Sequence, residues 1–457
     1  MAMAIGAKEE KRNFYRTVLA LVVPMAVQNL INVGVQAADV VMLGRVGETA
    51  ISAASLAGQV YFVMSLFFFG LTSGAAVLTA QYWGKGDIKT IEKVLALALK
   101  IGVAVSAVFC AAALCFPRAL MSLFSNEEEV IAEGIKYMRI VAAAYIPSAI
   151  TMVYLNVIRS VERVVVSTVV YTVSLCVNVV LNAVLIFGLC GAPALGVSGA
   201  AIATAIARYT ETAIVIFYAV KMNDTVRVRA KNFFGTDKLL VQDFTKYALP
   251  VTVNEVLWGS GISVISAIIG HLGKAAVAAN SVAYVVRQLA MVATFGIANA
   301  TAIMLGKVIG EGKTDLARTY SVRFIKITAV LGLCGAALIL AITPAIVHIM
   351  ALGAEAGGYL RGMLAVMAYF VIFSGFNTVL IVGVFRAGGD TKFGLIIDSG
   401  VLWGGAILFG AIAAFWWKLP VMAVYVILTA DEIVKAPISF WRYRSYKWLR
   451  NVTRDFD

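Results

Sequence analysis

Long apolar stretches alternate with short polar segments along the whole chain. Each apolar stretch can cross a hydrocarbon core of about 30 Å as an α-helix, which rises about 1.5 Å per residue. The pattern therefore predicts an all-α polytopic membrane protein with twelve transmembrane helices. The predicted spans are residues 17–43, 51–80, 92–116, 133–158, 164–189, 195–220, 245–269, 276–305, 322–350, 358–385, 393–416 and 420–440.

The polar segment 221–244 is the longest of the predicted loops and lies near the midpoint of the chain. It divides the predicted helices into two groups of six. We therefore expect an N-terminal lobe at 1–220, a cytoplasmic linker at 221–244 and a C-terminal lobe at 245–457. The C-terminal lobe ends in a short basic tail.

The composition supports a membrane location. Hydrophobic residues make up 61% of the chain, charged residues only 14%, and the mean hydropathy is +0.90. A soluble domain has about 25% charged residues, because its surface must face water. The first apolar stretch is too long for the core of a signal peptide, so we expect a retained helix.

Basic residues are distributed unevenly between the two predicted sides of the membrane. Of the 38 Lys and Arg residues, 28 fall on the side of the N-terminus and seven on the other side. The positive-inside rule then predicts that both termini are cytoplasmic. The net charge of +13 is thereby explained by topology and anionic lipid rather than by nucleic acid, and we expect a prokaryotic inner membrane.

An internal repeat relates the two halves at a constant offset of 226 residues, which aligns Pro24 with Pro250. The same offset aligns GRVGETAISAAS at 44–55 with GHLGKAAVAANS at 270–281, and WGKGD at 83–87 with IGEGK at 309–313. Six helices separate the copies, so the repeats share one orientation in the membrane. Parallel repeats are typical of transporters whose substrate passes between two halves, although a channel remains an alternative.

Three segments together resemble the multidrug and toxic compound extrusion family of cation-coupled antiporters. They are ADVVMLGRVGETAISAASLA, the WGKGD loop and FRAGGDTKFGLIIDSGVLW. The resemblance covers essentially the whole chain. It implies a V-shaped pair of six-helix lobes with a central cavity that opens alternately to each side. It also implies export of organic, often cationic and aromatic, compounds in exchange for H⁺ or Na⁺.

Asp39 lies inside the first predicted span, where an ionised side chain costs at least about 2.5–3.5 kcal/mol on insertion scales. Gln28, Asn32, Gln36 and Asp39 are spaced by four, four and three residues, so they form one stripe. We expect the stripe to face the lobe interior or a wet cavity. Asp39 is then a coupling residue, and Asn32 and Gln36 are possible substrate or cation contacts. A polar seam between helices is the alternative for the amides.

Further oxygen-bearing side chains lie at a comparable depth. Asn178 and Asn182 are one turn apart on the fifth predicted helix, and Thr204 is on the sixth. At about 1.5 Å per residue, these residues and Asp39 lie roughly 6–17 Å from the outer ends of their helices. Such hard oxygen ligands suit Na⁺ and can equally hydrogen-bond a protonated acid. We therefore predict a coupling site for H⁺ or Na⁺ at these four residues.

The family resemblance implies the same site. Members of the family carry an Asp on the first helix, an Asn and an Asp one turn apart on the fifth, and a Thr on the sixth. Here these positions match Asp39, Asn178, Asn182 and Thr204, and the Ala200 carbonyl is a possible further ligand. Asn182 departs from the pattern. A single carboxylate weakens the case for Na⁺ and makes protonation of Asp39 sufficient for coupling.

Two charged residues of the C-terminal half are possible substrate or cation contacts. Glu255 lies five residues after Pro250, and Arg287 lies midway along the eighth predicted helix. Glu255 could attract a cationic compound, whereas the alternative is a partly hydrated acid near the cytoplasmic end. Arg287 could pair with Glu255 or select anionic groups.

The remaining charges within spans favour structural roles. Arg208 and Glu211 are spaced i, i+3 and can neutralise each other. Asp398 lies near Arg386 and Lys392, with which we expect it to pair. At the end of the last span we expect membrane-interface positions for Asp431, Glu432 and Lys435.

The sequence favours a secondary antiporter over three other classes. A lipid-linked oligosaccharide flippase of related fold would require many deep basic residues, and only Arg208 and Arg287 are deep. No nucleophile–base pair, metal-ligand cluster or P-loop indicates an enzyme or an ATP-driven pump. We expect no cofactor beyond the coupling ion, and a monomer that contacts small organic molecules and lipid.

Overall fold

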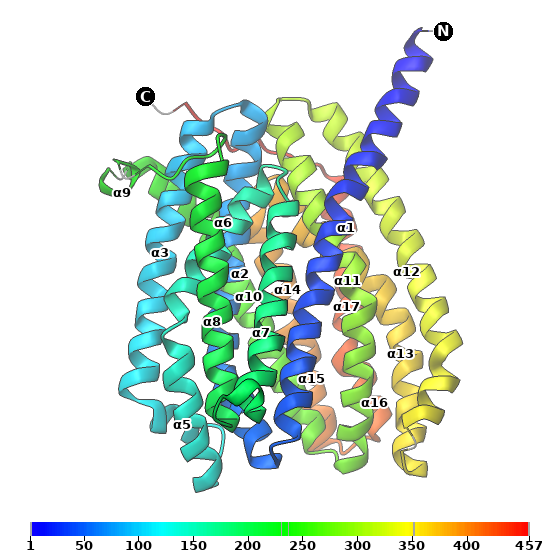
Figure 1. Ribbon diagram of the computed structural model, residues 1–457. Coiled ribbons are helices and arrows are strands. Elements are labelled where there is room, and N and C mark those ends of the chain that lie inside the picture. Colours follow the sequence, from blue (N-terminus) through cyan, green and yellow to red (C-terminus); the bar gives the residue numbers. More distant parts are fainter. Residues whose placement is uncertain (1, 230, 236, 351, 456–457) are drawn as a thin grey trace. The chain divides into compact units, whose positions relative to one another are not determined.

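The computed structural model describes residues 2–229, 231–235, 237–350 and 352–455, and every regular element in these ranges is a helix (Figure 1). The α-helices of the first half are α1 (Ala2–Gly44), α2 (Glu48–Lys85), α3 (Ile88–Cys115), α4 (Pro117–Ser122), α5 (Glu128–Ala142), α6 (Tyr145–Ser160), α7 (Val165–Phe187), α8 (Gly196–Phe217) and α9 (Lys231–Phe234). Those of the second half are α10 (Lys238–Gly270), α11 (Lys274–Gly310), α12 (Thr314–Met350), α13 (Ala354–Thr378), α14 (Thr391–Val401), α15 (Leu408–Ala411), α16 (Val421–Thr429) and α17 (Asp431–Arg444).

The prediction of an all-α polytopic membrane protein is confirmed. Ten helical segments of the described residues are long and apolar enough to cross a membrane. The pair α5 and α6, bent by 52°, brings this number to eleven if it forms one span. The last predicted span forms α16 and α17, which meet at Ala430. Short π-helical segments extend or interrupt several spans, including η3 (Val379–Phe385) after α13 and η4 (Leu402–Ile407) after α14.

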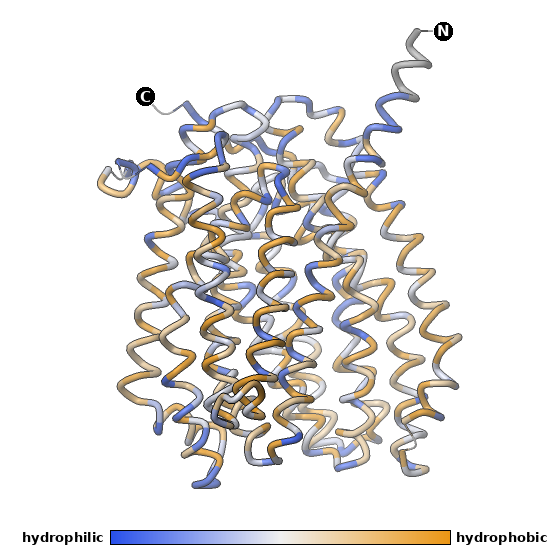
Figure 2. Tube along the Cα trace, viewed as in Figure 1, coloured by the Kyte–Doolittle hydropathy of each residue, from blue (hydrophilic) through white to orange (hydrophobic). Residues whose placement is uncertain are grey.

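Hydrophobic side chains cover the outside of the helices as well as their packed faces. Leu333, Leu338 and Leu340 on α12 are each more than half exposed, which suits contact with lipid rather than water. Figure 2 shows hydrophobic residues along the middle of the helices, whereas hydrophilic residues gather toward helix ends and loops. A few hydrophilic positions interrupt the apolar stretches, and these include the candidate functional residues.

The chain divides into two compact units. The N-terminal unit consists of residues 24–79 and 87–246, and the C-terminal unit consists of residues 1–23, 80–86 and 247–457. The first half of α1 and the end of α2 therefore pack with the second half of the chain. The change of unit within α1 occurs at Pro24, whose ring interrupts the backbone hydrogen-bond ladder of a helix.

Small residues allow close helix packing in the C-terminal unit. Ala276, Ala279 and Ala283 repeat along one face of α11 and are completely buried in a cluster that includes Leu360 and Leu364 of α13. Side chains this small let helix backbones approach closely, which gives van der Waals contact without a hydrophobic driving force.

The repeat-related ends of α2 and α11 contact each other within the C-terminal unit. A Cβ atom on Gly84 would lie 1.9 Å from the Lys307 carbonyl oxygen, and one on Gly310 would lie 1.9 Å from the Gln81 carbonyl oxygen. The repeat offset relates Gly84 to Gly310 and Gln81 to Lys307. Each contact is therefore the counterpart of the other, as expected for a local pseudo-two-fold axis.

The C-terminal residues after α17 pack on the end of α2. The buried Gln81 donates to the carbonyl oxygens of Ala387 at 2.6 Å and Arg450 at 3.1 Å, and it accepts from the Val452 amide at 2.7 Å. Trp448 is fully buried and donates to the Tyr443 carbonyl at 3.0 Å. The basic tail is thus part of the folded C-terminal unit.

Candidate functional site

Asp39 lies in the second half of α1 and contacts the predicted residues of α7 within the N-terminal unit. The Asn182 Nδ2 atom donates to Asp39 Oδ1 and also to Asn178 Oδ1, at 3.1 Å. The Asn178 Nδ2 atom lies 3.5 Å from Thr204 Oγ1 on α8. The four residues predicted from the sequence therefore form one connected group, which we call the Asp39 cluster.

Local packing fixes the helices that carry this cluster. Gly199 allows α8 to approach the end of α7, because a Cβ at this position would lie 2.4 Å from the Leu185 carbonyl oxygen. The Leu195 amide donates to the same carbonyl at 2.9 Å. Thr168 donates to the Pro24 carbonyl at 3.0 Å, which attaches α7 to α1. Three helices are thus held where their polar side chains meet.

One polar atom of the Asp39 cluster has no partner. Asn178 and Asn182 are buried, and Asn182 Oδ1 makes no hydrogen bond within the described residues. A buried unpartnered carbonyl oxygen costs free energy of about 1–3 kcal/mol. This oxygen can accept a hydrogen bond from a protonated group or coordinate a cation. The cluster can therefore bind a proton-bearing group or a cation in addition to making its own hydrogen bonds.

Tyr137 on α5 belongs beside the cluster although sequence reasoning missed it. Its hydroxyl lies near that of Thr204, and its ring packs against the apolar cluster that contains Leu43, Ala50 and Ala200. No local sequence signal distinguishes Tyr137 from the other aromatic residues. Only the packing of α5 against α8 brings it to this position.

The other polar residues predicted on α1 differ in exposure. Asn32 and Gln36 are exposed, and among the described residues no hydrogen bond joins either of them to the Asp39 cluster. Gln28 is buried, and its Oε1 atom is unpartnered among these residues. Ala200 is buried one turn before Thr204 on α8. Along the polar stripe of α1, Gln28 is therefore buried, whereas Asn32 and Gln36 are accessible.

A second set of polar residues in the N-terminal unit contains opposite charges that neutralise each other. Arg208 pairs with Glu211 at 2.7 Å, as the i, i+3 spacing predicted, and Ser174 donates to the same Glu211 oxygen. The Arg208 guanidinium also lies 5.9 Å from the ring centre of Tyr61. Arg208 is close enough to Asp39 for electrostatic attraction.

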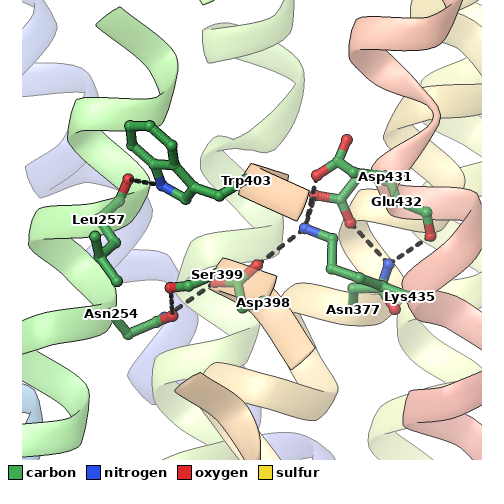
Figure 3. Close-up of polar contacts among 9 residues, drawn as sticks. All are labelled: Asn254, Leu257, Asn377, Asp398, Ser399, Trp403, Asp431, Glu432 and Lys435. Carbon is green, nitrogen blue, oxygen red and sulfur yellow. Dashed lines mark hydrogen bonds and ion pairs between the residues drawn. The ribbon is translucent and has the colours of Figure 1, made fainter. Parts of the chain in front are cut away.

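A buried ion cluster occupies the C-terminal unit and centres on Lys435 (Figure 3). The Lys435 ammonium lies 2.9 Å from Asp398, 2.8 Å from Asp431 and 3.0 Å from Glu432. Asn377 donates to the Glu432 carboxylate at 2.7 Å. All three residues are buried, and the Lys435–Asp398 pair connects α17 to α14. The expected position of Asp431, Glu432 and Lys435 at the membrane interface stays a prediction.

Asp398 forms an ion pair, as predicted, but its partner differs from the expected ones. It pairs with Lys435 rather than with Arg386 or Lys392, and it accepts a hydrogen bond from Asn254 at 3.0 Å. Asn254 in turn accepts from Ser399 at 2.9 Å, so α10 and α14 are connected by neutral as well as charged groups (Figure 3).

The ion partner of Glu255 is Arg386 and not Arg287. Their side chains meet at 2.5 Å, and both residues are buried. Arg287 instead lies against two aromatic rings, 5.0 Å from the centre of Tyr284 and 5.6 Å from that of Phe370. Glu255 and Arg287, which could form a pair according to the sequence, thus lie in different environments.

Comparison with known proteins identifies the family. The family model described as MatE matches residues 24–184 and again residues 250–412. The two matches begin at Pro24 and Pro250, the prolines that the internal repeat aligns. This chain belongs to the MatE family. It is a multi-pass membrane transporter of the multidrug and toxic compound extrusion (MATE) type, as the resemblance implied.

Similar proteins span almost the full length of this MATE chain. A "Probable multidrug resistance protein NorM" of Bradyrhizobium diazoefficiens is 26% identical over 438 residues, covering 93% of this chain and 92% of the relative. A "Probable multidrug resistance protein YoeA" of Bacillus subtilis is 23% identical over 454 residues, covering 98% of each.

Solved structures share the fold. One described as "Outward-facing conformation of a multidrug resistance MATE family transporter of the MOP superfamily" has a TM-score of 0.85 at 19% identity, over 94% of this chain and 95% of the other. Another, "Crystal structure of MATE in the bent conformation", has a TM-score of 0.86 at 19% identity and the same coverage.

Proposed function

We propose that this MATE transporter exports small organic, cationic aromatic compounds in exchange for entering H⁺, by alternating access, with Asp39 as the proton-carrying residue. Both termini lie in the cytoplasm of a prokaryotic cell in this proposal, and the protein acts as a monomer. The relatives named as multidrug resistance proteins support efflux of drugs. Asn32 and Gln36, exposed on the same helix as Asp39, are proposed contacts for substrate or cation.

The orientation of the Asn182 side chain supports H⁺ rather than Na⁺ as the coupling ion. Its Nδ2 donor, and not its oxygen, faces the Asp39 carboxylate. A donor stabilises an ionised carboxylate directly. After protonation, rotation of the amide would present Oδ1 to the new O–H group. Na⁺ would require several oxygens directed at one point, whereas this cluster has a single carboxylate.

The proposed cycle uses this difference between the two protonation states. Ionised Asp39 is held by Asn182 and by the field of Arg208. A proton neutralises the carboxylate and weakens both interactions, so α1 is less strongly held to α7. Exchange follows if the protonated state favours release of the organic cation and the ionised state favours its binding.

The test is efflux of a fluorescent aromatic cation from proteoliposomes under an imposed pH or Na⁺ gradient. We expect efflux in the wild type to follow the pH gradient without Na⁺. Efflux should fall to background in Asp39→Asn. Asp224→Asn is the matched control, because Asp224 belongs to the same unit and its side chain is 90% exposed.

Full cation-driven transport by Asp39→Asn would contradict the coupling role. Efflux that requires Na⁺ and ignores the pH gradient would make Na⁺ the coupling ion at Asp39, Asn178, Asn182 and Thr204. Movement of a lipid-linked sugar without any organic cation would instead favour a flippase. Loss of activity in Asp224→Asn as well would indicate a general defect rather than loss of coupling.

A further inference from the structure

Arg287 is a charged residue within a membrane span of the C-terminal unit. It lies 13 residues after the start of α11, which is about 20 Å along the helix at 1.5 Å per residue. No carboxylate within the described part of the chain pairs with it, and its contacts there are with the rings of Tyr284 and Phe370. An intramembrane guanidinium without a counter-ion requires a ligand or water.

Two acids of the same unit are already engaged elsewhere. Glu255 pairs with the buried Arg386, and Asp398 pairs with Lys435. Neither can turn to Arg287 without leaving another buried charge unpaired, which costs about 3–5 kcal/mol. The arrangement therefore leaves Arg287 as a positive charge available to an external partner.

The surface beside Arg287 is polar and accessible. Ser281, Tyr284 and Gln288 are exposed on one flank of α11, spaced by three and four residues. The apolar Val285 and Leu289 lie on the other flank of the exposed surface. Lipid tails cannot hydrogen-bond an amide or solvate a guanidinium. The polar flank therefore faces water, and a dissolved compound can reach Arg287.

The side chains around Arg287 favour one class of ligand. A guanidinium presents N–H groups in a planar fork that matches a carboxylate with two parallel hydrogen bonds. Both rings lie beside the guanidinium, the buried Phe370 on the core side and the exposed Tyr284 on the accessible side, so the Tyr284 ring offers a surface on which an aromatic ring can stack. The buried Tyr425 lies near enough to interact electrostatically with the guanidinium, so the apolar side of the site is also aromatic.

We propose that Arg287, Tyr284 and Phe370 form a binding subsite for aromatic carboxylates. This proposal rests on the export function proposed above, and it widens the substrate class from cations to zwitterionic and anionic aromatic compounds. The carboxylate binds the Arg287 fork, the buried Phe370 supports the guanidinium from the core side, and the aromatic ring of the compound lies against the exposed Tyr284.

Three probes with one ring system test the subsite: 2-naphthoate, the neutral 2-naphthamide and the cation (2-naphthylmethyl)ammonium. Binding to the purified full-length protein is measured by calorimetry in phosphatidylcholine nanodiscs, so that neither a gradient nor an anionic lipid takes part. We expect the wild type to bind naphthoate more tightly than naphthamide. This ligand comparison tests the subsite without any substitution.

Substitutions at Arg287 then test whether its guanidinium causes the preference for naphthoate. Arg287→Gln should raise the Kd for naphthoate by roughly 10- to 100-fold and change the Kd for naphthamide by less than about twofold. Arg287→Lys keeps the charge without the fork and should give an intermediate loss. Arg361→Gln removes an exposed positive charge from the same unit and should change neither Kd.

Equal affinity of the wild type for naphthoate and naphthamide would overturn the proposal, as would equal losses for both in Arg287→Gln. Retention of a phospholipid phosphate by Arg287, with no naphthoate binding, would also overturn it. Naphthoate binding without proton-driven efflux would refute the proposed antiport and leave the subsite intact. Proton-driven efflux of the cation without naphthoate selectivity would refute only the subsite.

Discussion

At the scale of single residues, Asn182 connects the parts of the Asp39 cluster. Its amide nitrogen donates to both Asp39 and Asn178, while its oxygen is buried and unpartnered in the described structure. A neutral amide at this place lets Asp39 be the only carboxylate of the cluster. The ionic selectivity of the cluster should therefore depend on the side chain at this position.

Asn182→Asp should make efflux responsive to Na⁺. The new carboxylate removes the N–H donor and places a second negative charge beside Asp39, so a cation bound between them gains electrostatic stabilisation. The measurement is efflux with and without Na⁺ at fixed pH, with Asn232→Asp on α9 as the control. Efflux that stays independent of Na⁺ would show that charge at this position does not set ion selectivity.

Lys435 is the second residue whose neighbours define its role. One ammonium lies within 3.0 Å of three carboxylates, so the cluster is net negative when all of its groups are ionised. Removal of the ammonium would leave buried carboxylates that repel one another. Buried ion pairs broken in this way are destabilising by about 3–5 kcal/mol.

Lys435→Met should therefore lower the thermal stability of the purified protein strongly at neutral pH. Stability should recover partly as the pH falls, because protonation of the carboxylates removes their repulsion. Melting temperatures across a pH series measure this, and the exposed Lys447→Met is the control. A neutral-pH melting temperature equal to that of the wild type would indicate that the cluster is already protonated or hydrated.

At the scale of elements, glycine positions decide how closely helices approach. Gly199 brings α8 against the end of α7, and the pair Gly84 and Gly310 brings α2 against α11. In each case a Cβ would meet a backbone carbonyl, which cannot move aside as a flexible side chain can. The helix ends therefore depend on the absence of a side chain.

Gly84→Ala and Gly310→Ala should each destabilise the protein by about 1–3 kcal/mol, because the backbones must separate to admit the methyl group. The two effects should be similar, since the contacts are repeat-related. Gly58→Ala on α2 is the control, because a Cβ there meets no atom within 4 Å. Thermal unfolding in detergent measures all three variants, and an unchanged stability of both test variants would contradict the contact.

At the scale of the whole molecule, duplication produced two halves with different chemistry. The repeat places Ile265 at the position that corresponds to Asp39. Ile265 packs against the apolar core of the C-terminal unit, whereas Asp39 joins a polar cluster in the N-terminal unit. The C-terminal unit has buried ion pairs instead, among them the Lys435 cluster and the Glu255–Arg386 pair.

The orientation in the membrane gives a prediction at the same scale. In a variant without the five native cysteines, a cysteine at Glu129 should react with a membrane-impermeant maleimide added to intact cells. A cysteine at Asp224 should react only after permeabilisation. The basis is the excess of basic residues on the side of the termini. The reverse labelling pattern would place the termini outside.

The sequence alone determined the helical membrane fold, the repeat and the residues of the Asp39 cluster. These features follow from local properties: apolar length, a constant offset, and the spacing of polar residues that lipid cannot solvate. Helical periodicity was sufficient to place Asn178 beside Asn182 and to pair Arg208 with Glu211.

Tertiary structure decided the partners of the remaining charges. Arg386 rather than Arg287 neutralises Glu255, and Lys435 draws Asp398, Asp431 and Glu432 into the interior. Tyr137 joins Thr204 only because α5 packs on α8. Which acid meets which base depends on the rotation and depth of helices distant in sequence. Hydropathy and spacing do not contain that information, because they describe one helix at a time.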